Sequence, residues 1–132
     1  MTYNEDWQLY CDFKGSIIRF SGEEIYYIYS EHRKTYVHTR EKSYQINVRL
    51  NEVEQMLEGL PMVRTHCSFL VNLRHMKSMD GFEMRMNNGI VIPISERRRK
   101  DVYQQVRMHL FASSLNRTFC IVKNAGRMID YA

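Results

Sequence analysis

Hydrophobic and polar residues alternate in short runs along most of the chain, and this two-residue period is typical of β-strands. The runs are rich in Val, Ile, Tyr and Phe, and Gly, Ser or Asn residues separate several of them. The run 25–29 is apolar throughout, which fits a strand buried on both faces. We expect strands at 7–13, 16–20, 25–29, 34–39, 43–48, 62–65, 83–86 and 90–94.

Turn signals indicate how some of these strands pair. Asn87-Asn88-Gly89 predicts a hairpin between its two flanking strands, because Asn and Gly tolerate positive φ. Arg40-Glu41-Lys42 predicts another hairpin, and 31–34 forms a charged tip between two strands. Segment 68–72 fits either a helical turn or a strand, and 74–79 alternates only weakly.

Two segments show helical spacing instead. The first helix is expected at about 50–59, where Asn47 or Asn51 could cap its start. The second is expected at about 96–110, with Ser95 as its cap. We therefore predict a mainly β fold of small antiparallel sheets with two helices. No pair of helices joined by a short Gly turn is predicted, which argues against a helix-turn-helix reader.

The composition fits one domain. The chain has 132 residues, 44% hydrophobic and 26% charged, which argues against long disorder. No apolar run approaches the roughly 20 residues of a membrane helix, and the polar start lacks the features of a secretory signal. Cys11, Cys67 and Cys120 lie far apart with no Cys-x-x-Cys pair, so we expect no metal or other cofactor. We expect a cytoplasmic protein with three reduced thiols.

The positive charge is concentrated in particular segments. The net charge is +4, and 13 of the 19 basic residues are Arg, whose flat fork of donors suits phosphates and guanine edges. Nine basic residues fall within 63–110, whereas 50–62 contains acidic residues and no basic ones. This clustering favours a basic surface for a polyanionic partner, although a solvated surface explains the charge alone equally well.

The run Arg97-Arg98-Arg99-Lys100 is the strongest single signal. Cations at the start of a helix oppose the helix dipole, which suggests that a ligand supplies the negative charge. Free backbone N–H groups at such a start also favour phosphate. The alternative is an exposed charged run without a ligand. The tip 31–34 is a second basic segment. It could reach a groove, or it could be charged simply because it is exposed to solvent.

The segment 62–72 contains an adjacent His66 and Cys67. On an extended backbone they point to opposite faces and make a poor nucleophile–base pair, and His66 could equally be a hydrogen-bonded, partly buried histidine. No enzyme motif appears elsewhere, so we expect no enzymatic activity. The many tyrosines could stack on RNA bases, but in β-rich runs such as 25–29 aromatic residues are more often core residues.

Two ordered blocks, 63–72 and 88–100, carry a resemblance to the LytTR family of bacterial DNA-binding domains. Val63-Arg64-Thr65-His66-Cys67-Ser68-Phe69-Leu70-Val71-Asn72 resembles the family pattern R-x-H-x-S-[FY]-[LV]-V-N. Asn88-Gly89-Ile90-Val91-Ile92-Pro93-Ile94-Ser95-Glu96-Arg97-Arg98-Arg99-Lys100 resembles N-G-x-x-[IV]-P-[IV]-S-x-x-x-x-K. The resemblance covers about 17–110 and implies small antiparallel sheets that read duplex DNA with loops. It divides the chain into an extension at 1–16, the DNA-binding domain at 17–110 and an appendage at 111–132, in which 119–122 could add a strand.

The resemblance also implies which residues contact DNA. Base contacts fall to Arg33 or a neighbour, to Cys67 and to Arg97, and phosphate contacts to Ser68, Ser95, Arg98, Lys100 and Arg49. The family commonly has Arg or Asn at the position of Cys67, and a thiol is a poor donor to a base edge. The full candidate set is Arg33, Lys34, Arg49, His66, Cys67, Ser68, Ser95, Arg97, Arg98, Arg99 and Lys100.

The expected function is that of a sequence-specific transcriptional regulator that binds double-stranded DNA, with its sites in direct repeats. The resemblance further implies a stand-alone regulator without a receiver domain, a homodimer on DNA, and a membrane inhibitor protein that acts in trans. The tail 111–132 could dimerise the chain or bind that partner. The alternatives are a protein-interaction module of the same fold with weak DNA binding and, third, an RNA-binding β module.

Cys67 carries a separate hypothesis. A partly exposed thiol in a basic site has a lowered pKa and reacts as the thiolate, so Cys67 is expected to be the most reactive of the three cysteines. A bulky or anionic group on its sulfur would then block the approach of DNA. The alternative is a small apolar residue packed beneath the loop.

Overall fold

A five-stranded antiparallel sheet lies at the centre of the molecule. In the computed structural model, which describes residues 7–115, its strand order is β5-β4-β3-β7-β6. Hairpins join β3 to β4, β4 to β5 and β6 to β7, and the central pairing of β3 with β7 is the long-range contact that closes the sheet. The strands are β3 (Tyr27–Glu31), β4 (Lys34–His38), β5 (Ser43–Ile46), β6 (Met62–His66) and β7 (Phe69–Asn72).

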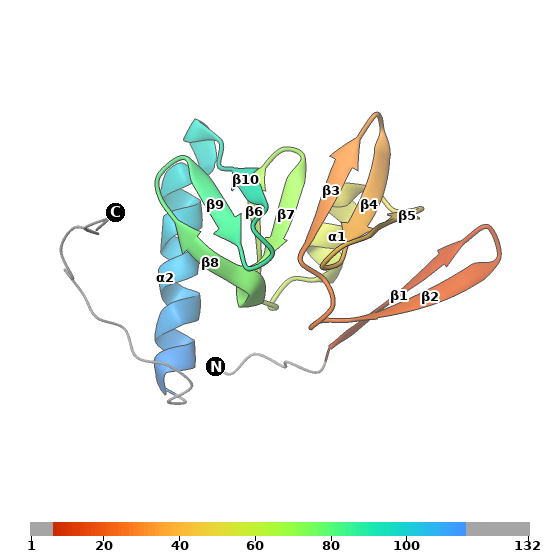
Figure 1. Cartoon of the computed structure of the whole chain (residues 1–132), viewed down its shortest axis with the longest axis horizontal. Coiled ribbons are helices and arrows are strands. Elements are labelled where there is room, and N and C mark those ends of the chain that lie inside the picture. Colours follow the sequence, from red (N-terminus) through yellow and green to blue (C-terminus); the bar gives the residue numbers. More distant parts are fainter. Residues whose placement is uncertain (1–6, 116–132) are drawn as a thin grey trace.

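Smaller elements cover this sheet (Figure 1). A two-stranded sheet, β1-β2, and a three-stranded sheet, β10-β9-β8, are both antiparallel. Their strands are β1 (Gln8–Phe13), β2 (Ser16–Ser21), β8 (Met76–Met79), β9 (Glu83–Met86) and β10 (Val91–Pro93). The helices are α1 (Leu50–Met56) and α2 (Arg99–Leu115), with 3-10 turns η1 (Leu73–His75) and η2 (Glu96–Arg98).

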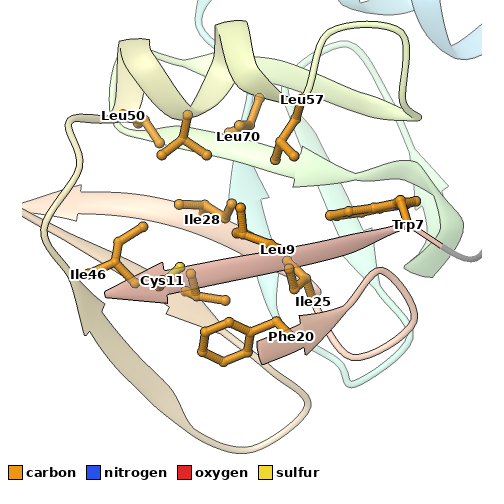
Figure 2. Packing of buried hydrophobic residues seen from close by; sticks show 12 residues of the cluster. Trp7, Leu9, Cys11, Phe20, Ile25, Ile28, Ile46, Leu50, Leu57 and Leu70 are labelled. Atoms are coloured by element: carbon orange, nitrogen blue, oxygen red, sulfur yellow. The ribbon is translucent and has the colours of Figure 1, made fainter. Parts of the chain in front are cut away.

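Alternation along the central strands gives the molecule two hydrophobic cores. On one face, Ile28 and Leu70 pack with the apolar side of α1 and with the β1-β2 hairpin, which contributes Leu9 and Phe20. Figure 2 shows these side chains meeting between α1, the central sheet and the hairpin. On the other face, Tyr27, Val63 and Val71 pack against the three-stranded sheet and α2, through Met84, Met86, Ile92, Val102 and Val106. The central sheet is therefore buried on both sides.

Asn72, the last residue of the first motif, joins three segments. Its side chain is fully buried, and its Nδ2 donates to the carbonyls of Gly22 at 2.9 Å and Ile25 at 2.8 Å. Its Oδ1 accepts a hydrogen bond from the Arg74 amide at 3.0 Å. Because these bonds connect the β2–β3 link to the end of β7, this motif residue stabilises the fold rather than a surface site.

The fold class is confirmed, and the segment that the sequence left open at 68–72 is strand β7. The predicted caps are wrong. Neither Asn47 nor Asn51 caps α1, whose N-cap is Arg49 without a side-chain hydrogen bond. Ser95 precedes η2 instead of α2, because residues 96–98 first form a 3-10 turn in which the Arg98 amide donates to the Ser95 carbonyl at 3.0 Å.

Element ends also differ from the expectation. Helix α1 stops at Met56, before the positive-φ Gly59, and α2 continues beyond residue 110 to Leu115. Strand β1 contributes buried residues to the first core, so the expected extension at 1–16 includes part of the packed structure. The division of the chain at 16 and 110 stays a prediction, and the expected strand at 119–122 lies outside the described residues.

The β3–β4 tip is a two-residue turn under backbone strain. Glu31 pairs with Lys34, and between them His32 and Arg33 have φ values of 50° and 64°. Positive φ at both central residues is the type I′ geometry that matches the twist of a hairpin, and Asn-Gly is its preferred pair. A large side chain such as Arg therefore occupies a conformation that costs about 1 kcal/mol relative to Gly.

We predict that the double substitution His32→Asn/Arg33→Gly stabilises the protein, by up to about 1 kcal/mol, because it relieves this strain. Denaturant unfolding measures the change. Glu41→Gly is the control, since Glu41 is exposed in the β4–β5 loop and does not have positive φ. A double variant that is no more stable than the wild type would contradict the strain.

Candidate nucleic-acid interface

Three connections lie along one edge of the molecule, the upper edge in Figure 1. They are the β3–β4 turn, the β6–β7 turn and the segment 95–100 that contains η2 and the start of α2. Backbone hydrogen bonds fix their relative positions, because the Ser30 amide donates to the Ser68 carbonyl at 3.0 Å and the Ser95 amide to the Thr65 carbonyl at 2.9 Å. We call this set of three connections the loop edge.

The β3–β4 turn presents exposed cations. Arg33 and Lys34 are exposed, and so is Arg49, which precedes α1. Arg33 and Arg49 line one cleft of about 500 Å³ between the hairpin and the start of α1. The other described residues that line it are Ser30, Thr35, Leu50 and Asn51, none of which is a carboxylate. The cleft therefore offers two guanidinium groups to an anion without a competing acid in its lining.

The β6–β7 turn contains Cys67 and Ser68. Cys67 is exposed, and its Sγ lies 3.5 Å from His66 Nδ1 and 3.8 Å from Ser68 Oγ. The expectation that His66 and Cys67 point to opposite faces is wrong, because β6 ends at His66 and the chain turns at Cys67. The Ser68 amide donates to His66 Nδ1 at 3.1 Å, so this nitrogen is unprotonated and the half-buried ring shapes the turn.

The four cations of the basic run have different surroundings. Arg97 and Lys100 are exposed, whereas Arg98 and Arg99 are partly buried. The Arg99 guanidinium lies 4.3 Å from the centre of the Phe82 ring, and its Nε atom is buried. Arg99 thereby ties the β8–β9 loop to the start of α2 through a cation–π contact, and Arg97 and Lys100 are the exposed cations of the run.

Ser95 is partly buried at the point where the chain leaves β10 and enters η2. The structure thus brings all eleven candidate residues to the loop edge or to the adjacent cleft, and the Arg99 side chain lies against Phe82. That these eleven contact DNA stays a prediction.

Arg64 is the important residue that the sequence did not identify as part of the site. Its guanidinium is buried and donates to the carbonyls of His66, at 2.9 Å, and Cys67. It also donates to Asn51 Oδ1 at 2.9 Å and to Glu54 Oε1 at 2.7 Å, both on α1. Arg64 is part of the first sequence motif, but only the fold shows that α1 packs beside the turn that Arg64 contacts.

Within residues 7–115 no group of three or more His, Cys, Asp or Glu side chains is placed to hold a metal ion. No helix in this described part of the chain is long and apolar enough to cross a membrane.

The two described cysteines differ in accessibility, and this generates a prediction. Burial raises the pKa of the Cys11 thiol, which keeps it protonated at neutral pH, whereas Cys67 is exposed on the loop edge. In a Cys120→Ser background, a thiol reagent should modify Cys67 at least about tenfold faster than Cys11 in the folded protein. Peptide mass analysis of timed samples locates the label, and Cys67→Ser is the control. Equal labelling of both thiols would contradict this placement.

Comparisons with known proteins agree with this geometry. The family model described as the LytTr DNA-binding domain matches residues 15–107. Among solved structures, the chain is similar to the LytTr DNA-binding domain of a response regulator from Bacillus cereus, with a TM-score of 0.66 and 23% sequence identity. The similarity covers 75% of this chain and 95% of that one. No curated protein matches the chain.

The structural similarity confirms the fold, and the family match extends through both sequence motifs and all three connections of the loop edge. The chain therefore belongs to the LytTR family of DNA-binding domains.

Proposed function

We propose that this protein is a sequence-specific transcriptional regulator whose loop edge reads double-stranded DNA in the bacterial cytoplasm. The observation that carries the proposal is that exposed Arg33, Arg97 and Lys100 lie on the loop edge, with exposed Arg49 in the adjacent cleft. Phosphate contacts dominate DNA affinity, and arginine forks add base readout in the major groove.

In this proposal the three connections make different contacts with DNA. Arg97 reads a base edge from η2, and Arg33 reaches a second base from the β3–β4 turn. Ser68, Ser95, Arg98, Lys100 and Arg49 contact phosphates, which sets the register of the protein on the duplex. Cys67 has no strong donor, so the β6–β7 turn contributes fit and phosphate contacts more than base-edge hydrogen bonds.

The family resemblance supports the finer parts of the proposal. They are binding sites in direct repeats, a homodimer on DNA, regulation in trans by a membrane inhibitor protein, and the absence of enzymatic activity. One observation favours the second candidate, a protein-interaction module. Met108, Phe111 and Leu115 are 71%, 64% and 67% exposed along one side of α2, and exposed apolar side chains at helical spacing suit a protein partner.

Selection of bound duplexes from a random pool tests the function directly. A sequence-specific regulator enriches a short motif, and the proposed direct repeats should appear as two copies in the same orientation. Binding that falls steeply with salt without enrichment of any motif would indicate nonspecific DNA binding. Binding that is both weak and independent of salt would favour the protein-interaction module.

We predict that Arg97→Ala weakens binding to the selected site and relaxes preference at one base pair, at a cost of about 1–3 kcal/mol. Lys100→Ala should weaken target and random DNA alike and reduce the slope of log K against log salt by about one unit. Titrations with both duplexes at several salt concentrations measure these effects.

Arg107→Ala is the matched control, because Arg107 is exposed on the same helix and lies against Tyr103 away from its first turn. It should leave sequence preference unchanged. If the Arg97 and Lys100 variants bind both duplexes as the Arg107 variant does, the start of α2 does not contact DNA.

A further inference from the structure

The buried side chain of Arg64 holds the β6–β7 turn through hydrogen bonds to its backbone. The Arg64 side chain is 8% exposed, and all three of its guanidinium nitrogens donate hydrogen bonds. Nε and Nη2 bond the two successive carbonyls of His66 and Cys67, while Nη1 bonds Asn51 and Glu54 on α1. The flat fork of Arg makes this arrangement possible, and the single ammonium of Lys cannot reproduce it.

The surroundings of Arg64 exclude a direct role in binding an anion. Its charge is paired with Glu54 at 2.7 Å, and four of its five N–H donors are already used by protein acceptors. Any effect on DNA must therefore pass through the position of the residues that it holds. We propose that Arg64, Glu54 and Asn51 form a turn clamp, in which Arg64 is a positioning residue that sets the sequence selectivity of the loop edge. The inference rests on the proposed function.

Two connections of the loop edge depend on the backbone beside the clamp. The pairing of β6 with β7 shifts register between Arg64 and His66, which leaves Thr65 as an extra residue. The carbonyl of Thr65 accepts the hydrogen bond from Ser95 that fixes the entry to η2. An irregular strand has fewer ladder bonds to define its path, so the side-chain bonds from Arg64 to the two carbonyls that follow Thr65 help to determine where both connections lie.

Selectivity is more sensitive to this placement than nonspecific affinity is. The base contact proposed for Arg97 on η2, whose entry is held through Thr65, requires donors in a fixed geometry, whereas contacts to phosphates tolerate small shifts. A clamp that orders the turn before binding also removes the entropy cost of ordering it on DNA. Loosening the clamp should thus reduce binding to the target much more than binding to random DNA.

Two glutamates of α1 permit a test in which charge and positioning predict opposite results. Glu52→Gln and Glu54→Gln each remove one negative charge from the same helix, and Glu52 is exposed with no clamp contact. By charge alone, both variants bind DNA as tightly as the wild type or more tightly. The clamp instead predicts that Glu54→Gln lowers affinity for the selected target about tenfold while affinity for random DNA stays level or rises. Equal behaviour of the two variants would overturn the proposal.

A second measurement tests the turn clamp independently of the proposed function. The Ser68 amide bonds His66 within the turn, so its hydrogen exchange reports how firmly the turn is held. Exchange at Ser68 should be faster in Glu54→Gln and in Asn51→Ala than in Glu52→Gln, measured at a temperature at which all three variants are folded. If the wild type shows no preference for any duplex, the proposed function fails, and unchanged exchange at Ser68 overturns the clamp independently.

Discussion

The burial of both faces of the central sheet is the constraint on which the rest of the structure depends. Ile28 faces α1 and the β1-β2 hairpin, while its neighbour Tyr27 faces the three-stranded sheet and α2. A shift of one residue in the pairing of β3 with β7 would exchange these two sets of side chains, so the register is strongly determined. The register determines where the strands end. The β3–β4 and β6–β7 turns at those ends are two of the three connections of the loop edge.

Several exposed groups on the loop edge cost stability where they stand. Arg33 occupies a left-handed conformation at the tip of a hairpin, and Arg97 and Arg98 form the turn that leads into α2. The acidic Glu54 on α1 is paired with the buried Arg64 and not with an exposed cation of the loop edge. The core supplies the stability that lets these charged and strained groups remain at the surface.

Local patterning predicted most of the fold. Alternation marked the strands, and Asn88-Gly89 marked the hairpin in which Gly89 has a φ of 90°. The start of α1 was predicted, but both caps were mispredicted, because neither α1 nor η2 is capped by a side chain. The turn η2 replaces the expected first turn of α2. The start of α2 depends on how the chain leaves β10, and residue propensities do not determine that.

The candidate site was predictable only in part. The motifs predicted the residues of two connections, and the charged tip between two strands predicted the third. No sequence pattern predicted that Glu54 and Asn51 contact Arg64, because that contact crosses from a helix to a turn. The contact of Arg99 with Phe82 could not be predicted from the sequence for the same reason, because the β8–β9 loop meets α2 only in the folded chain. The contact between His66 and Cys67 required knowing where β6 ends.

The central claim is that one edge, formed by two turns of the central sheet and by segment 95–100, meets DNA. Titration of the isotope-labelled protein with its selected duplex, followed through backbone amide resonances, tests it most directly. The largest changes should fall at 31–34, 66–68 and 95–98, with little change on the exposed side of α2 at Met108 and Phe111. Changes concentrated on that side of α2 or on the β1-β2 hairpin, with the loop edge unaffected, would contradict it.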